Sequence, residues 1–377
     1  MSDRSILEAL GGALALDAHL VVALSGGLDS CVLLHALRFP LGRRPVAAHF
    51  DHAMRPGSAA DADWVRGLCR AWGVDLKEGT ISDTTPTSED QARQARYAFL
   101  KRAAVERGAL LLTAHHADDQ AETVLFRALR GTGIEGLAGI PERRTLPPCG
   151  DGDGDGAAVE VVRPLLSVWR EELEAYALRH RVPWRNDPTN ESLGYARNVL
   201  RKRVLPEVEE QVASGARRSL VRLAEIAGKE EEAWSAAMRI ILPAVDARRP
   251  SVDARRPAVD ARRPEVDARR PAVAHRHSSS CDRQALLDLG PALAARVVRL
   301  LVADAGITLD LDTTRRALDF IADSQSGRGI ELGKGVELRL DGKRVEVIPP
   351  AHSEASARSE ASARSEPPDP SPKTPAS

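Results

Sequence analysis

The chain has 377 residues and a formal net charge of −1 at pH 7, so it is long enough for two or three domains with a sizeable core. The near-zero charge excludes a general attraction for nucleic acid, and any RNA site must therefore be a local patch. The four scattered cysteines form no CxxC pair and indicate neither a cysteine zinc site nor a disulfide framework. With no signal-peptide pattern at its start and no apolar run of membrane length, the sequence predicts a cytoplasmic protein.

The first informative stretch is VVALSGGLDSCVLLHAL, which covers residues 21–37. Val21–Leu24 is an apolar, partly β-branched run that ends at glycine, which predicts a buried strand, and Cys31–Leu37 predicts a helix. The glycine pair permits a tight turn, and the free N–H groups at a helix start suit a phosphate. Asp29 beside a phosphate makes chemical sense if Mg²⁺ lies between them. For the glycine pair alone, a plain strand-to-helix turn is the alternative.

Up to about residue 200, strand-like apolar runs alternate with helical periodicity. PVAAHFDH and LLLTAHHA are the further strand candidates, and helices are expected at Ala59–Trp72 and Gln91–Arg107. This alternation predicts an α/β fold in which helices cover a parallel sheet. Because ligands bind at the carboxyl ends of such strands, residues 49–52 and 115–119 should line one crevice with SGGLDS.

HHADDQAET, residues 115–123, places polar side chains where a strand gives way to a helix. His115 and Asp119 are four apart, as are Asp118 and Glu122, so each pair could share a helix face and hold Mg²⁺ or orient a nucleophile. Two adjacent histidines lack the i, i+4 spacing of helical zinc ligands. The alternative is a solvated helix start with acidic residues in its first turn.

Two stretches flank this region. Residues 88–100 place Arg93 and Arg96 three apart on a helix, where they could grip phosphates or remain solvated. RGTGIEG, residues 130–136, contains GxGxxG but follows a helix rather than a strand, which indicates a glycine-rich connection.

Residues 184–206 interleave basic groups with Trp184 and Tyr195, a mixture that suits an RNA backbone with a base to stack. A turn around Pro188 and a solvated helix face are the alternatives. We expect no carboxylate partner for Arg201 and Arg203. The candidates for substrate or RNA contact in this stretch are Asp187, Asn190, Arg201 and Arg203.

The rest of the chain divides by composition. Residues 201–242 predict a helical connector, and residues 243–280 hold a VDARRPx repeat whose prolines forbid a continuous helix and predict a disordered linker. Residues 281–350 predict a small α+β domain, and residues 351–377 predict a disordered tail. Upstream, GDGDGDG at residues 150–156 predicts a flexible acidic loop, too uniform for a calcium-binding EF-hand.

Within the small domain, helices are expected near Leu286–Ala305 and Thr313–Asp323. Short strands are expected from Gly329 to Ile348, with a turn at Asp341–Lys343.

The order and spacing of seven motifs resemble the tRNA(Ile)-lysidine synthase family, within the PP-loop group of N-type ATP pyrophosphatases. These motifs are SGGLDS, HFDHAMRPGS, ARQARY, HHADDQAET, RGTGIEGLAGI, RPLL and WRNDPTN…YARN. The resemblance runs from about Val21 to Pro206 and implies a PP-loop catalytic domain, similar to adenine nucleotide alpha hydrolases, over residues 1–200. CDRQALLDLG onward resembles a shortened form of that family's substrate-binding domain. The VDARRPx repeat is not part of the family pattern, and the tail does not resemble the further C-terminal domain of longer members. How the protein would bind the tRNA acceptor stem is therefore left open.

The resemblance implies a reaction as well. ATP would adenylate the wobble cytidine of the CAU anticodon of tRNA(Ile), and free L-lysine would displace AMP to give lysidine, which changes methionine identity to isoleucine identity. ATP and Mg²⁺ are the implied cofactors, tRNA(Ile) and L-lysine are the implied partners, no membrane is involved, and a homodimer is left open.

The motifs and the resemblance together single out the site residues. Those expected to be catalytic are Asp29, Asp119, Glu122 and Arg197. Those expected to bind ATP are Ser25, Gly26, Gly27, Leu28, Asp29, Ser30, His49 and His115, with Asp29 also as the metal ligand. Those expected to bind substrate or RNA are Arg93, Arg96, Asp118, Asp187, Asn190, Arg201 and Arg203.

Two other functions are open. A different PP-loop enzyme that modifies tRNA or forms amides is one of them; a thiolase of this kind would need a cysteine pair or a reactive cysteine, whereas Cys31 is expected to pack as a small hydrophobe. A non-catalytic RNA-binding relative is the other.

Overall fold

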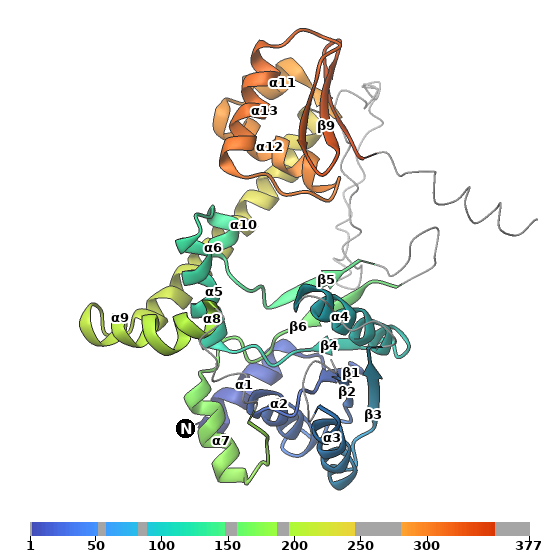
Figure 1. The fold of residues 1–377 in the computed structure, drawn as a ribbon, viewed down its shortest axis with the longest axis vertical. Coiled ribbons are helices and arrows are strands. Elements are labelled where there is room, and N and C mark those ends of the chain that lie inside the picture. Colours follow the sequence, from blue (N-terminus) through green and yellow to red (C-terminus); the bar gives the residue numbers. More distant parts are fainter. Residues whose placement is uncertain are drawn as a thin grey trace, which may run out of the picture. The chain divides into compact units, whose positions relative to one another are not determined.

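The computed structural model describes residues 2–51, 58–81, 89–147, 157–186, 196–245 and 280–350. Asp187, Asn190, the acidic loop, nearly all of the VDARRPx repeat and the tail lie outside these ranges, and so do the predictions made for them. The chain divides into two compact units, Met1–Ala233 and Trp234–Ser377 (Figure 1).

The first unit is built on a six-stranded sheet with the strand order β3-β2-β1-β4-β6-β5 (Figure 1). Its strands are β1 (Leu20–Ala23), β2 (Val46–Asp51), β3 (Leu76–Thr80), β4 (Leu110–Leu112), β5 (Arg143–Leu146) and β6 (Val159–Val162). All neighbouring strands are parallel except β5, which pairs antiparallel with β6. The predicted parallel sheet is therefore confirmed apart from this edge strand. The polar edge strands β3 and β5 escaped prediction because their pairing, not their own apolar content, makes them strands.

Helices cover both faces of this sheet. The helices packed on it are α1 (Ser2–Ala13), α2 (Leu28–Arg38), α3 (Ser58–Trp72), α4 (Glu89–Val105) and α7 (Arg170–His180). Two further helices, α5 (Ala117–Leu129) and α6 (Ile134–Leu137), follow β4 in the chain. Successive strand residues point to opposite faces. Leu112 and Val162 join the core formed with α1, α2 and α7, whereas Leu111 and Val161 join the core formed with α4. Burial on both sides explains why the central strands are continuous apolar runs.

A helical connector follows, as predicted. It consists of α8 (Ala196–Val199), the π-helical turn η2 (Leu200–Val204), α9 (Leu205–Gln211) and α10 (Ala216–Val245). Pro206 is tolerated in the first turn of α9, where its missing N–H would have no helical partner. Within the described ranges, no helix is both long and apolar enough to cross a membrane.

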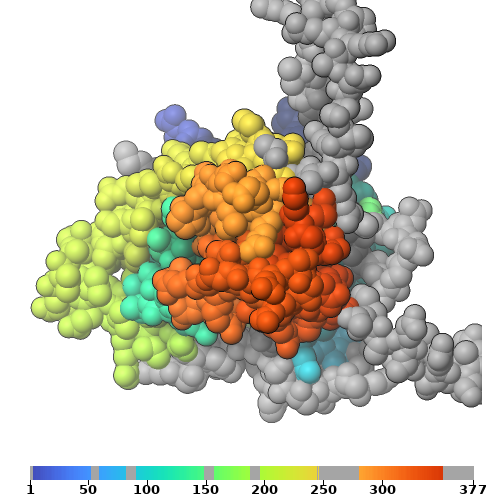
Figure 2. Space-filling model, turned by 90° about the horizontal axis from the view of Figure 1, so that it is seen from above, coloured from blue at the N-terminus to red at the C-terminus, as the bar shows by residue number. Residues whose placement is uncertain are grey.

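The second unit has its own core, which includes Met238 and Val245 of α10. Its elements are α11 (Arg283–Asp288), α12 (Pro291–Ala303), α13 (Leu311–Asp323), β7 (Ser280–Asp282), β8 (Gly329–Gly333), β9 (Val336–Asp341) and β10 (Arg344–Ile348). The strands form an antiparallel sheet in the order β7-β10-β9-β8. Figure 2 shows residues 280–350, coloured orange to red, as one compact body.

One helix of this unit was predicted wrongly. The expected helix over Leu286–Ala305 is two helices, because Gly290 takes a φ of +76° and Pro291 then starts α12. The predicted turn at Asp341–Lys343 is confirmed between β9 and β10.

The turn between β1 and α2 depends on Gly26. Its φ is +88°, and a Cβ atom at this position would lie 3.2 Å from Cγ2 of Val65. Gly27 then caps α2 in an extended conformation, so the helix begins at Leu28, three residues before the predicted start at Cys31. The periodic apolar pattern begins only at Cys31, whereas the first turn of the helix is polar.

Gly26→Ala should therefore lower the free energy of unfolding by about 1 kcal/mol or more, because alanine fits neither the backbone conformation nor the space. Gly67→Ala is the matched control: Gly67 lies within α3, a Cβ atom added there would have no neighbour within 4 Å, and alanine should stabilise by about 0.5–1 kcal/mol. Urea denaturation of both variants measures the difference. Equal stabilities would contradict the strain assigned to Gly26.

Candidate active site

The loop between β1 and α2 is braced by its own serines. Ser30 Oγ donates to Gly27 O at 3.1 Å and accepts from Ser25 N at 3.2 Å. Ser25 Oγ accepts from Gly27 N at 3.3 Å and lies 3.1 Å from Ser30 Oγ. The loop lies at the carboxyl end of β1, where the strand order changes direction from β2 to β4, the place where open α/β sheets bind ligands. The start of α2 adds a partial positive charge that favours phosphate.

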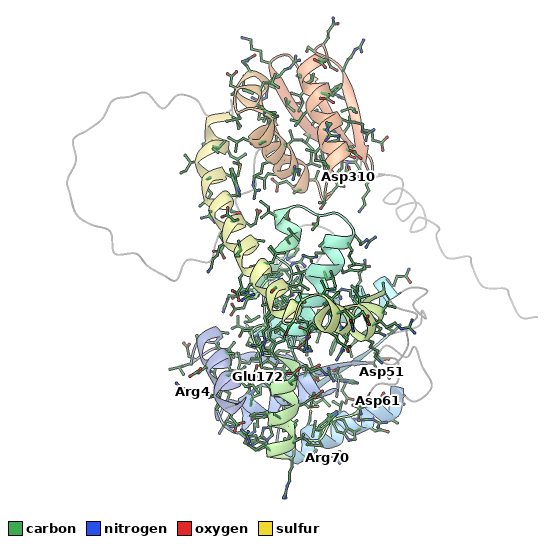
Figure 3. The ribbon with its side chains drawn as sticks, turned by 90° about the vertical axis from the view of Figure 1, so that its left-hand side faces the viewer. Arg4, Asp51, Asp61, Arg70, Glu172 and Asp310 are labelled. Carbon is green, nitrogen blue, oxygen red and sulfur yellow. The ribbon has the colours of Figure 1, made fainter. Side chains whose placement is uncertain are left out.

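Neighbouring elements hold this loop from two sides. His49 of β2 is buried, and its Nδ1 donates to Leu24 O at 2.8 Å. Arg185 N donates to Gly26 O at 2.9 Å, and Arg185 Nε lies 2.8 Å from Asp61 Oδ1 of α3. Figure 3 labels Asp61 together with Asp51, the last residue of β2.

Asp29, in the first turn of α2, faces two cations. Its Oδ2 lies 3.8 Å from Nε2 of His116 and 3.7 Å from Nη1 of Arg170. Its Oδ1 is buried and has no hydrogen-bond partner. Burial raises the pKa of Asp29, and the nearby His116 and Arg170 offset this only in part.

The orphaned oxygen of Asp29 is chemically suited to Mg²⁺, which takes one or two carboxylates together with substrate phosphates and water. In the described part of the chain, no group of three or more His, Cys, Asp or Glu side chains could hold a metal ion. A metal at Asp29 would therefore depend on phosphate oxygens for its other ligands.

His116 lies at the centre of the acidic groups. It is 2 % exposed, and besides Asp29 it lies 3.5 Å from Oδ2 of Asp118 and 3.7 Å from Oδ2 of Asp119. Burial opposes its charge, but the three carboxylates outweigh burial and raise the pKa of His116. The sequence prediction included His116 in the stretch expected to line the crevice, residues 115–119, but gave it no role.

His116 also determines where α5 begins. It takes an extended conformation as the N-cap, and its N–H donates to Asp119 Oδ2 at 3.0 Å, so the helix begins at Ala117. His115 lies before the helix, and the prediction that His115 and Asp119 share a helix face is wrong. His115 still belongs to the site: burial and the guanidinium groups of Arg163, Arg197 and Arg96 lower its pKa to about 4, against the opposing charge of Asp119.

Arg197 joins the two carboxylates expected to be catalytic. Its Nη2 donates to Asp119 Oδ1 and its Nε to Glu122 Oε2, both at 2.8 Å. Burial raises the pKa of Glu122, which is 2 % exposed, although the contacts with Arg197 oppose the shift. For Asp119, burial opposes ionisation, but the nearby His116 and Arg197 outweigh it and lower the pKa.

Arg201 reaches the same carboxylate as Arg197, one helical turn away. Its Nε lies 3.7 Å from Glu122 Oε1, so the expectation that Arg201 lacks a carboxylate partner is wrong. Sequence inspection could not show this pair, because Glu122 lies far away in the chain. Arg203, in contrast, is exposed.

Protein groups bind both oxygens of Asp118. Oδ2 accepts from Arg170 N at 2.9 Å, and Oδ1 accepts from Arg217 Nη1 at 2.7 Å. Burial opposes ionisation, but the contacts with His116, Arg170 and Arg217 hold the pKa of Asp118 well below its usual range.

A basic flank lies beyond His115. The guanidinium groups of Arg93 and Arg96 lie 5.3 and 5.5 Å from the ring centre of Tyr97, a cation–π distance. Arg163, which follows β6 directly, is 5 % exposed and donates to Pro141 O at 2.7 Å, while its Nε has no partner. Trp184, expected to stack a base, packs instead against the core of the first unit.

The structure therefore brings most of the predicted residues to one edge of the sheet. The polar residues that the sequence prediction missed are Arg163, Arg170 and Arg217, and it gave His116 no role.

Residues 3–208 match the model of the PP-loop domain, which is more than half of the chain. Together with the sheet and the braced loop, this match defines the class as a PP-loop protein.

Three curated tRNA(Ile)-lysidine synthases are similar to the chain. The one from Gloeobacter violaceus is 38% identical over 62% of this chain and 70% of its own length. The one from Thermotoga maritima is 39% identical over 51% of this chain and 45% of its own length. The one from Pseudomonas aeruginosa is 40% identical over 54% of this chain and 46% of its own length. The chain thus spans less than half the length of the latter two relatives. The chain belongs to the tRNA(Ile)-lysidine synthase family of PP-loop proteins.

The raised pKa of His116 predicts how stability changes with pH. A group whose pKa is raised by folding stabilises fully below its unfolded pKa of about 6.5, and this contribution is lost as the pH rises through the folded value. His116→Gln should therefore cost most stability near about pH 6, with a difference from wild type that shrinks toward about pH 9. Urea denaturation across this range measures it, with the exposed His19→Gln as the control. A difference that grew with pH would contradict an imidazolium at this position.

Proposed function

We propose that the protein is an ATP-dependent ligase that joins L-lysine to the wobble cytidine of tRNA(Ile) with a CAU anticodon, through an adenylated cytidine. The observation that carries this proposal is one continuous set of contacts. Asp29 beside the phosphate loop meets His116, His116 meets Asp119, and Asp119 shares Arg197 with Glu122. A nucleotide-activating group and an amine-binding group thus lie at one site.

Each half of the site has a physical task in this reaction. The loop N–H groups and the start of α2 would stabilise charge on the departing pyrophosphate. Asp29 would hold Mg²⁺, which supplies Lewis-acid neutralisation of the phosphates when bound. Asp119 and Glu122 would receive the ammonium group of lysine. The raised pKa of Glu122 suits it to accept the proton that the lysine amine must lose before it attacks.

The described cysteines argue against sulfur transfer. Cys31, Cys69 and Cys281 are buried, and Cys31 packs as the small hydrophobe that was predicted. Burial raises the pKa of Cys31 to about 12 and that of Cys69 to about 11. Reactive cysteines need the opposite shift, toward the thiolate.

The division of the chain adds further proposals. Residues 281–350 would contact the tRNA, the VDARRPx segment would act as a spacer, and a tRNA substrate would place the protein in the cytoplasm. A measurement of the molecular mass in solution would show whether the protein is a homodimer.

The direct test incubates the protein with ATP, radiolabelled lysine and tRNA(Ile) bearing the CAU anticodon, and counts label in RNA. Label that depends on ATP and on the wobble cytidine is the expected result. Transfer of sulfide or glutamine nitrogen in place of lysine would refute the proposal, and so would RNA binding without ATP–pyrophosphate exchange.

Asp29→Asn should separate activity from stability. Because burial raises the pKa of Asp29, its charge destabilises the fold at neutral pH, and the neutral amide should raise the melting temperature. The same change should slow single-turnover lysidine formation by about a hundredfold or more, since the charge that holds the metal is removed. A variant with near-normal turnover would contradict the role of Asp29.

Arg201 and Arg203 should differ in their effects. Arg203→Ala removes an exposed cation, so it should lower the salt slope of tRNA binding by about 0.7–0.9 units for each phosphate that Arg203 neutralises in the wild type. Arg201→Ala should slow lysine transfer at saturating tRNA and leave the salt slope unchanged, because Arg201 lies against Glu122. Binding measured across a salt series, with single-turnover rates beside it, distinguishes them. The reverse pattern would contradict this division.

A further inference from the structure

Arg217, in the first turn of α10, joins three other helices at one guanidinium group. Its Nη1 donates to Asp118 Oδ1 of α5 at 2.7 Å, and its Nε donates to Glu209 Oε2 of α9 at 2.8 Å. Its Nη2 reaches Glu171 Oε1 of α7 at 3.3 Å. The guanidinium carbon also lies 5.8 Å from the ring centre of Trp169.

Asp118 extends this junction toward the reaction centre. Its second oxygen accepts from the backbone N–H of Arg170, the first residue of α7, and therefore satisfies an N–H group that the helix leaves free. The same oxygen lies 3.5 Å from Nδ1 of His116. Arg170 and His116 are the two cations that face Asp29.

We infer that Asp118 and Arg217 are positioning residues, which together orient His116 and Arg170 against Asp29 in the ligase reaction; this inference rests on the proposed function. Asp118 binds the backbone N–H of Arg170 and lies within ion-pair distance of the His116 ring. Arg217 fixes Asp118 by charge and hydrogen bond, and ties it to α7, α9 and α10.

The geometry argues against a direct contact between Asp118 and lysine, the role expected from the sequence. Both oxygens of Asp118 are bound by protein groups, and the side chain is 11% exposed. An incoming ammonium group would have to displace Arg217 and leave that guanidinium facing the remaining carboxylates. Asp119 and Glu122 are both held by Arg197, so a lysine ammonium group would share them with that guanidinium group.

The test compares wild type with Asp118→Asn, Arg217→Met, Arg217→Lys, the double variant of Asp118→Asn with Arg217→Met, and Arg218→Met. Arg218 is the matched control, since it is exposed, follows Arg217 in α10 and lies 5.4 Å from the same Trp169 ring. Each protein is assayed for single-turnover lysidine formation, ATP–pyrophosphate exchange with tRNA present, KM for lysine, tRNA dissociation constant and melting temperature.

Asp118→Asn and Arg217→Met should each slow exchange and single turnover by about tenfold to a hundredfold, the usual effect of losing a group that orients a ligand of the reaction centre. KM for lysine and tRNA affinity should be unchanged. The double variant should be no slower than the slower single variant, because both changes break the same support. Arg217→Lys should recover part of the rate, and Arg218→Met should match wild type.

Other results would overturn the inference. A raised KM for lysine in Asp118→Asn at an unchanged rate would make Asp118 a lysine ligand. Folded variants with normal rates would show that the pair is a purely structural contact. The same conclusion would follow if the rate losses paralleled the fall in melting temperature and Arg217→Lys did not relieve them. If the wild-type protein catalysed ATP–pyrophosphate exchange but did not use lysine, the proposed function would be wrong. The positioning role of Asp118 and Arg217 would still be tested, by the exchange rates of their variants.

Discussion

His116 is buried, yet its neighbouring carboxylates raise its pKa, and this balance is the constraint on which the site depends. Three carboxylates, those of Asp29, Asp118 and Asp119, lie within 3.8 Å of its ring nitrogens in a region with little access to water. Without a cation between them, these carboxylates would repel one another, and some would take up protons. The same residue caps α5, so the local backbone and the charge balance are determined together. Removing the basic group from such a buried cluster is costly, because the carboxylates around it lose their compensation.

Around this centre the charges are sorted by sign. On one side the carboxylates of Asp119 and Glu122 are shared by Arg197, and this side suits a substrate ammonium group. On the other side lie Arg163 and Arg96, which add to the effect of burial in lowering the pKa of His115, and this side suits an anion. The sorting follows from the sheet, because β4 carries the acidic helix α5 and its neighbour β6 leads directly into Arg163. The acidic and basic sides of the site therefore meet at the carboxyl edge of the strands.

The sequence predicted features that depend on neighbours along the chain. The β1–loop–α2 unit was foreseen from an apolar run, a glycine pair and a second apolar run, and the structure confirms it. Features that depend on distant contacts were missed. Arg170 and Arg217 show no local pattern that marks them, yet they meet Asp29 and Asp118 through the fold. Arg201 was expected to be without a carboxylate partner because Glu122 lies on another helix. His115 was placed on a helix because periodicity does not reveal an N-cap.

The position of Arg217 in α10 connects the site to the rest of the chain. α10 is one helix from Ala216 to Val245; it begins beside Asp118 and ends with Met238 and Val245 in the core of the second unit. At the start of this helix, Arg217 bonds directly to Asp118 beside the site. Arginine suits the role better than lysine, because its planar fork bonds several carboxylates at fixed angles, whereas an ammonium group imposes no such geometry.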